Sequence, residues 1–180
     1  MNNFFSVSVF FVFLLLFFQN CNNSIQEVNL KTNGKEMPVS SIRKIEMTYS
    51  DSALLKARIK APMMETYSGE KEYAEFPKGI EMTFYGPDGE IDSRLTAGYA
   101  ISYNREEKME TKNNVVLKNN KGETLNTEHL IWDKKQNRIY SNVFTKITSP
   151  ARIIYGEGFE TKGDFSKYKI LKIRGAVNLK

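Results

Sequence analysis

The feature that most constrains the fold is the placement of apolar residues at every second position in most of the chain. They alternate in this way over residues 45–49, 55–61 and 80–84, and charged residues such as Lys56 and Lys60 lie between them. A period of two is typical of a β-strand with one face in a core and the other in water. No stretch shows the period of a convincing amphipathic helix, so the sequence predicts an all-β domain.

The longest alternation runs from Ile91 to Tyr103 and places seven odd-numbered side chains on one predicted face. Small residues interrupt it at Ala97 and Gly98. Because a glycine within a strand often marks a bend or a bulge, we expect this segment to curve around the sheet or to pass between two sheets. Further strands are predicted at residues 115–117, 130–132, 139–148, 152–155 and 168–177.

Turns are predicted between these strands, at residues 86–89, 119–122, 133–137 and 156–158, because each contains residues that tolerate tight or positive-φ backbone. The first two end in Gly-Glu, and their glycines are 122 − 89 = 33 residues apart. We interpret this as a hairpin module that is used more than once. A succession of short strands with regular turns indicates a sandwich, a barrel or a jelly roll.

The N-terminal segment differs from the rest in composition. Its first twenty residues contain no Lys, Arg, Asp or Glu, and the apolar run Phe4–Phe18 is shorter than the roughly 20 residues that a membrane-spanning helix needs. We therefore predict a signal peptide at residues 1–20. Cys21, the single cysteine, follows it and is predicted to be a lipid anchor, the alternative being an ordinary thiol. Residues 21–41 are expected to form a flexible tether, and residues 42–180 the folded domain.

The charge balance narrows the class of partner. The chain has 26 Lys and Arg against 21 Asp and Glu, a formal net charge of +5, and these charges are dispersed as singles and pairs. Nucleic acid, an anionic membrane and a phosphorylated glycolipid are all compatible with a basic balance. Because the chain carries a secretion signal and no nucleic-acid-binding motif, we exclude nucleic acid.

Residues that could carry catalysis are scarce. His129 is the single histidine, so a His-rich metal site is impossible, and a general base formed with Glu128 is a weaker interpretation than a solvent-facing or hydrogen-bonded core histidine. The pairs at 106–107 and at 70 and 72 lie in polar, turn-like stretches, where solvated charge is expected. We therefore predict no catalytic residues, no metal and no cofactor, and a carbohydrate-active enzyme, which needs two essential carboxylates, is a minor alternative.

What remains is the apolar face itself, which is rich in long, deformable or aromatic side chains. It could hold a lipid chain or fill an ordinary core, and the pattern alone does not separate the two. Phe144 belongs to the same apolar set. The candidates for an acyl-chain groove are Met47, Ile80, Met82, Phe84, Leu95, Tyr99, Ile101, Val115, Leu117, Leu130, Trp132 and Ile147.

An ordered set of motifs between Glu75 and Val177 resembles the LptC family of lipopolysaccharide-export proteins, and most closely the lipoprotein forms of Bacteroidetes. The match consists of Phe76–Ile80 with the following strand and Gly-Pro-Asp-Gly turn, Leu95–Ala100, Asn114–Leu117, the run from Gly122 that ends in His-Leu-Ile-Trp-Asp, and Ile153–Phe159.

The resemblance implies a slipped or open β jelly roll that holds lipid A acyl chains between its sheets, in the periplasm at the inner membrane. It also implies that the domain has no enzymatic activity of its own and that such domains join edge to edge. The strand with Ile45, Met47 and Tyr49 would then dock on the inner-membrane ABC transporter. The last strand, with Ile170, Ile173 and Val177, would receive an LptA-like bridge protein.

One departure from the family concerns the anchor, since many members keep a transmembrane helix where this chain has a short apolar run that ends at Cys21. We expect a lipid anchor in place of the helix. The alternative to a carrier is a non-transporting lipoprotein, a scaffold or adhesion module with a closed β-sandwich core.

Overall fold

The computed structural model describes residues 37–179 apart from 70–71, 163–164 and 166, so the predicted signal peptide and Cys21 lie outside the described residues. In the described part all regular structure is β, and no helix there could cross a membrane. The strands are β1 (Ser40–Asp51), β2 (Leu54–Tyr67), β3 (Tyr73–Phe76), β4 (Ile80–Tyr85), β5 (Ile91–Ala97), β6 (Tyr99–Tyr103), β7 (Lys108–Asn119), β8 (Thr124–Asp133), β9 (Arg138–Thr148), β10 (Arg152–Lys162) and β11 (Tyr168–Asn178).

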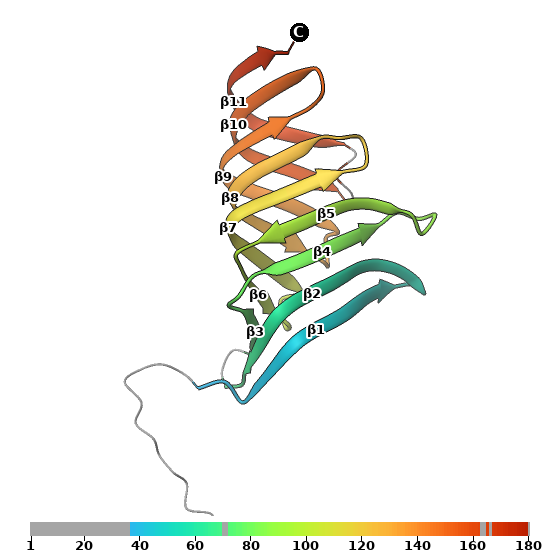
Figure 1. Ribbon diagram of the computed structural model, residues 1–180, viewed down its shortest axis with the longest axis vertical. Helices are drawn as coiled ribbons and strands as arrows, with labels where there is room; N and C mark the ends of the chain where they lie inside the picture. Colours follow the sequence, from blue (N-terminus) through green and yellow to red (C-terminus); the bar gives the residue numbers. More distant parts are fainter. Residues whose placement is uncertain (1–36, 70–71, 163–164, 166, 180) are drawn as a thin grey trace, which may run out of the picture. The chain divides into compact units, whose positions relative to one another are not determined.

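The strands form one antiparallel eleven-stranded sheet in the order β11-β10-β9-β8-β7-β5-β4-β2-β3-β6, with β1 on β2 and a second pairing of β6 with β7 (Figure 1). Long strands take part in two layers. In β2, residues 57–60 pair with β4 and residues 65–67 pair with β3, and in β7, residues 116–119 pair with β5 and residues 108–112 pair with β6. The predicted all-β fold is confirmed, and its layering is that of an open jelly roll.

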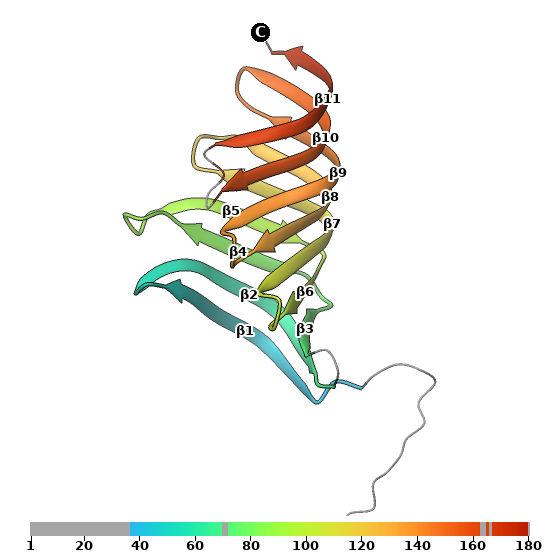
Figure 2. The ribbon, with the colours of Figure 1, turned by 180° about the vertical axis from the view of Figure 1, so that it is seen from behind.

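The long strands bend where they pass from one layer to the other. In β7 the pairing register breaks between Lys112 and Val115, and the two residues in between, Asn113 and Asn114, have φ values of 66° and 53°. Asparagine is among the residues that tolerate this left-handed region best. We call the side of these bends the bent side, and the opposite side, where turns join the strands, the open side (Figure 2).

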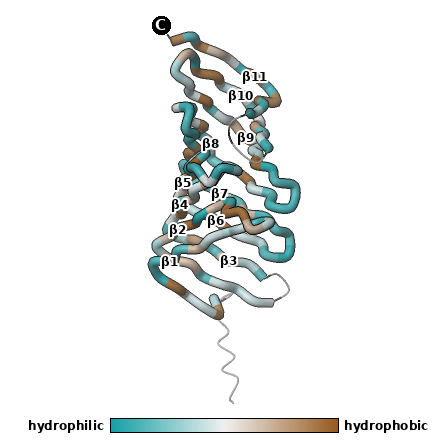
Figure 3. Tube along the Cα trace, turned by 90° about the vertical axis from the view of Figure 1, so that its right-hand side faces the viewer, coloured by the Kyte–Doolittle hydropathy of each residue, from teal (hydrophilic) through white to brown (hydrophobic). Residues whose placement is uncertain are grey.

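Apolar side chains from both layers meet in one core. The Trp132 ring of β8 contacts Tyr49 of β1 and Phe84 of β4 edge to face, with ring centroids 5.4 and 5.3 Å apart. Neither β1 nor β4 pairs with β8, so these contacts join one layer to the other. The hydrophilic residues gather in the turns (Figure 3), as expected for loops on a surface.

Most strand and turn predictions are confirmed. The alternating segments 45–49, 55–61 and 80–84 lie in β1, β2 and β4, and the chain changes layer at Gly98. The turns at 86–89 and 119–122 close the hairpins β4–β5 and β7–β8, so the hairpin module is used twice.

The predicted turn at 156–158 is wrong, because these residues lie inside β10. The pairing with β11 shifts register between Tyr155 and Gly156, and the pairing with β9 shifts between Glu157 and Phe159, around Gly158, which has a φ of 79°. A Cβ atom at Gly156 would overlap with the side chain of Ile170 in β11. The two glycines therefore accommodate a bulge and a close neighbour rather than a reversal of the chain. The short strand β3 was not predicted at all, and β7 and β8 are longer than predicted.

Gly79 lies at the crossing from β3 to β4, and its substitution tests how tight this crossing is. It has a φ of 87°, and a Cβ atom there would lie 2.8 Å from the backbone oxygen of Ala97. Gly89 has a similar φ of 82° but nothing within 4 Å. We expect Gly89→Ala to lower the free energy of unfolding by about 1–2 kcal/mol through backbone strain, and Gly79→Ala to lower it by about 1–3 kcal/mol more through overlap. Urea unfolding measures both, and equal losses would show that the crossing has room for a side chain.

Candidate functional site

The interior between the layers contains most of the residues predicted to line an acyl-chain groove. Nine of them belong to the core and none of these is more than 6% exposed: Ile80, Met82, Phe84, Leu95, Val115, Leu117, Leu130, Trp132 and Ile147. Met47 is half-buried and packs against them from β1. The structure thus brings ten predicted residues together, and their role as lipid ligands stays a prediction.

Tyr99 and Ile101 do not belong to the core cluster that the other predicted residues form, although Ile101 is only 8% exposed. Ala97 and Ala100 both belong to the core although they are three positions apart, so the change of layer at Gly98 shifts the alternation by one residue. Tyr99 and Ile101 therefore lie on the outer face of the sheet, where the Tyr99 hydroxyl donates a hydrogen bond of 2.9 Å to Glu75. Burial, together with this hydrogen bond, raises the pKa of Tyr99.

Phe144 also lies outside the core. It is 55% exposed, at the point where β9 bends and its pairing with β10 shifts register. An apolar residue at a bend can point outward because the alternation restarts there.

His129 takes part in a cluster of charges on the outer face. Its Nε2 atom lies 3.2 Å from Oε2 of Glu110, and the ammonium group of Lys112 lies 3.1 Å from the same oxygen. Within the described ranges, no three metal-ligating side chains gather in one place. His129 therefore contacts one carboxylate, that of Glu110 on the neighbouring strand β7, and Lys112 contacts the same carboxylate.

A pocket of about 250 Å³ opens on the open side, near the β1 end of the sheet. We call it the mouth pocket. It is lined by Tyr49, Asp51, Lys56, Phe84, Tyr85, Gly86, Pro87, Trp132, Lys134, Lys135 and Asn137. Since Phe84 and Trp132 are core residues, this pocket is where the interior meets solvent.

Lys134 covers the aromatic floor of the mouth pocket. Its ammonium nitrogen lies 5.8 Å from the ring centroid of Tyr49 and 5.6 Å from that of Trp132, within the range of a cation–π contact. The turn holds it there: the Lys134 backbone N–H donates to the Glu107 carbonyl at 2.9 Å, and the buried carboxylate of Asp133 accepts from Gln136 N–H at 2.9 Å. Burial lowers the pKa of Lys134, and the Glu107 carboxylate partly offsets this.

Sequence reasoning missed Lys134, since residues 133–137 were predicted only as a turn. The available signal was its position, because it follows directly after Trp132, a predicted inward residue, and Asp133. A lysine with a long apolar stem beside an inward aromatic residue can reach back over the ring.

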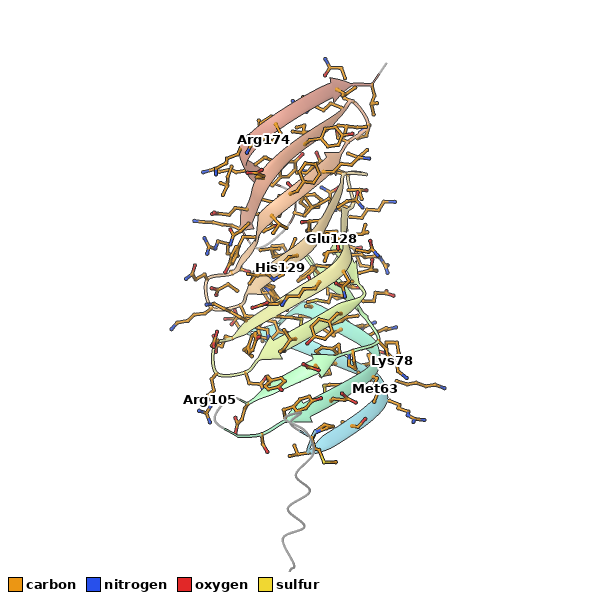
Figure 4. All side chains as sticks on the ribbon, turned by 90° about the vertical axis from the view of Figure 1, so that its left-hand side faces the viewer. Met63, Lys78, Arg105, Glu128, His129 and Arg174 are labelled. Atoms are coloured by element: carbon orange, nitrogen blue, oxygen red, sulfur yellow. The ribbon has the colours of Figure 1, made fainter. Side chains whose placement is uncertain are left out.

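A second hollow, of about 660 Å³, lies on the bent side. We call it the side groove. Apolar core residues such as Ile80 and Ala61 form part of its wall, and its cations are Lys44, Lys60 and Lys78. Figure 4 shows Lys78 and Met63 on one side of the layered sheet and Arg105, from the turn between β6 and β7, on the other.

At the β11 end, Phe165 fills the space between the layers on the open side. Its side chain is completely buried and packs against Phe159 and Tyr168. Its carbonyl accepts a hydrogen bond of 3.1 Å from the Asn119 side chain, so the connection between β10 and β11 is tied to the turn between β7 and β8. Access to the interior differs along the open side, with a pocket near β1 and a buried phenylalanine near β11.

Both ends of the sheet carry an edge strand. Of the pairings between described residues, those of β1 involve only β2 and those of β11 involve only β10. The predicted edge residues Ile45, Met47, Tyr49 and Ile170 pack against the core, whereas Ile173 and Val177 are 65% and 52% exposed. An edge with unpaired backbone groups and exposed apolar side chains can pair with another strand.

A comparison with protein-family models gives a match over residues 7–177, to the family described as lipopolysaccharide-assembly, LptC-related. The chain belongs to the LptC family. The resemblance predicted from the sequence is confirmed over nearly the whole length of this LptC-family chain. Membership gives it a role in lipopolysaccharide export and assembly and implies a periplasmic, inner-membrane-associated location. A comparison with curated proteins found no match.

Proposed function

We propose that this LptC-family protein holds lipopolysaccharide acyl chains between its two layers, accepting them from an inner-membrane ABC transporter and passing them toward the outer membrane. The observation that carries this proposal is the continuous apolar interior, which reaches solvent at the mouth pocket and ends on each side at a strand that pairs with only one other strand of the described structure. The protein works without catalysis, cofactor or metal, because transfer needs only a path of apolar surface and energy from a partner.

Acyl chains gain free energy in such an interior by leaving water. Each buried CH₂ group contributes about 0.8 kcal/mol before the costs of ordering. The core side chains occupy this space in the described structure, so a bound chain must take the place of side-chain contacts. Strand pairings run along each layer, and the layers face one another through side chains such as Trp132, Phe84 and Tyr49, which can move apart without breaking a backbone ladder.

The edge strands supply the proposed partner sites. The β1 strand, with Ile45, Met47 and Tyr49, docks on periplasmic parts of the transporter, and β11, with Ile173 and Val177, receives an LptA-like bridge protein. Unpaired N–H and C=O groups on an edge allow a partner strand to extend the sheet by β-augmentation. The exposed apolar side chains of β11 give the partner a surface to cover.

The membrane attachment follows from the N-terminal sequence. Residues 1–20 act as a lipoprotein signal peptide, the acylated Cys21 anchors the mature protein in the inner membrane, and residues 21–41 link it to the jelly roll at 42–180. A tether of this kind leaves the edge strand β1 free to reach the transporter.

A second candidate is a scaffold or adhesion lipoprotein with a closed core. The dense packing favours it, since Met82, Leu117 and Leu130 are completely buried. The two candidates differ in whether the interior ever admits lipid.

Photoreactive residues placed inside the core test whether lipid enters. In cells that export lipopolysaccharide, we expect a photoreactive amino acid at Phe84, Leu117 or Trp132 to capture lipopolysaccharide, because these side chains lie between the layers. Immunoblotting for lipopolysaccharide adducts measures the capture. The matched controls are Tyr99 and Ile101, which lie on the outer face and should give no adduct. Folded protein without an adduct from any inward position would favour the closed-core scaffold.

The role of β11 is tested by capture of protein instead of lipid. We expect a photoreactive residue at Ile173 or Val177 to crosslink in cells to a bridge protein, identified by mass spectrometry, because these side chains are exposed on an unpaired edge. Phe144 is the control: it is 55% exposed but lies on β9, which is paired on both sides. Equal capture from Phe144 would contradict an edge-specific contact.

The anchor is tested by mass spectrometry of the N-terminal peptide of the protein purified from membranes. We expect the mature chain to begin at Cys21 and to carry acyl groups, and Cys21→Ser to leave the signal peptide uncleaved. A chain that begins at Met1 in the unaltered protein would contradict the lipid anchor.

A further inference from the structure

The residues that line the mouth pocket carry more positive than negative charge. Three lysines line it, Lys56, Lys134 and Lys135, against one carboxylate, Asp51. The ion pairs formed between described residues include none of these three lysines. The Glu107 carboxylate stabilises the charged form of Lys134 in part but does not line the pocket, so the positive charge of the lining makes the pocket complementary to an anion.

Lys134 is the lysine of the mouth pocket that contacts the aromatic side chains at the boundary of the interior. Its ammonium group lies over the rings of Tyr49 and Trp132, and Trp132 in turn packs against Phe84 in the core. A ligand whose apolar tail lay between the layers and whose head left the interior here would bring that head to the Lys134 ammonium. A phosphate group accepts short charge-assisted hydrogen bonds from a lysine ammonium group, so it suits this position.

We propose that the mouth pocket binds the phosphate group of an acylated ligand, with Lys134 as its principal contact and with Lys56 and Lys135 adding to the positive field. This inference rests on the proposed function, since it takes the interior as the place of the tail. In the structure as described, the ammonium group occupies the aromatic floor, and on binding it turns from the rings to the phosphate oxygens.

The side groove is a weaker site for the same anion. Its Lys60 already forms an ion pair with Glu46 at 3.7 Å, and a second carboxylate, Glu81, also lines it. Three cations and two carboxylates there leave little net charge, whereas the mouth pocket keeps an excess of two cations. Of the two hollows, only the mouth pocket has aromatic rings, those of Tyr49, Phe84, Tyr85 and Trp132, in its lining.

The test uses the fluorescence of Trp132, which is the single tryptophan of the chain and lies in the mouth pocket. Full-length protein in phosphatidylcholine nanodiscs is titrated with octyl phosphate, octyl glucoside or inorganic phosphate at constant ionic strength, below concentrations that dissolve the discs. We expect octyl phosphate to change the Trp132 emission at a concentration about tenfold lower than octyl glucoside does. Inorganic phosphate should act more weakly than octyl phosphate, because it lacks a tail.

Three variants separate charge from packing. Lys134→Met keeps the apolar stem and should abolish the preference for octyl phosphate, whereas Lys134→Arg should retain it. Lys146→Met is the matched control, since Lys146 is also half-buried and lies over an aromatic ring, that of Tyr155, 6.0 Å away and outside the mouth pocket. This control should behave as the unaltered protein does, and thermal unfolding checks that each variant is folded.

Several outcomes would overturn the phosphate site. If both octyl compounds bind equally well, or if Lys134→Met keeps the preference, the site is not selective for phosphate, although the interior still admits tails and the carrier function stands. If inorganic phosphate binds as tightly as octyl phosphate, the pocket is a site for free phosphate without a tail. If neither octyl compound changes the emission, the phosphate site fails, and the capture of lipopolysaccharide by interior photoreactive residues decides separately whether the carrier function fails with it.

Discussion

The structure depends on long strands that each serve two layers. Because β2 and β7 pair with one set of neighbours in their first half and another in their second, the layers are parts of one continuous ladder and are held in register by the bends. The left-handed residues Asn113 and Asn114 and the bulge at Gly158 make these bends possible without loss of pairing beyond them. The layers are consequently connected by backbone on the bent side and by side chains on the open side.

This asymmetry explains where a ligand could enter. On the bent side, β2 and β7 cross between the layers as continuous strands and the side groove lies near the crossing at Gly79, whereas on the open side turns face one another across the core. The aromatic contacts of Trp132 with Tyr49 and Phe84 close the open side near β1, and buried Phe165 closes it near β11. Contacts of this kind are individually small and can be exchanged for contacts with an acyl chain of similar area.

Much of this fold could be predicted from the sequence, because half-buried strands leave a period of two that needs no knowledge of tertiary contacts. The period is lost where tertiary packing decides the conformation. At Gly98 the chain changes layer and the alternation shifts, so Tyr99 and Ile101 fall outside the core cluster and Ala100 lies in it. At Gly156 and Gly158 the glycines allow a bulge against β11, which local sequence does not distinguish from a turn. The core part of the candidate site followed from the pattern, but Lys134 did not, since only the fold brings a turn lysine over Tyr49 from a distant strand.

The two free edges also bear on how copies of the chain behave toward one another. Addition of β11 of one copy to β1 of the next would be a heterologous contact that does not close on itself, and such contacts give filaments of indefinite length. The charges of the two strands differ, since Arg43 and Lys44 on β1 are balanced by Glu46 and Asp51, whereas β11 carries Lys169, Lys172 and Arg174 and no carboxylate. The positive charge of β11 favours a partner whose pairing strand is acidic over the neutral β1 strand of another copy, and this preference disfavours such filaments.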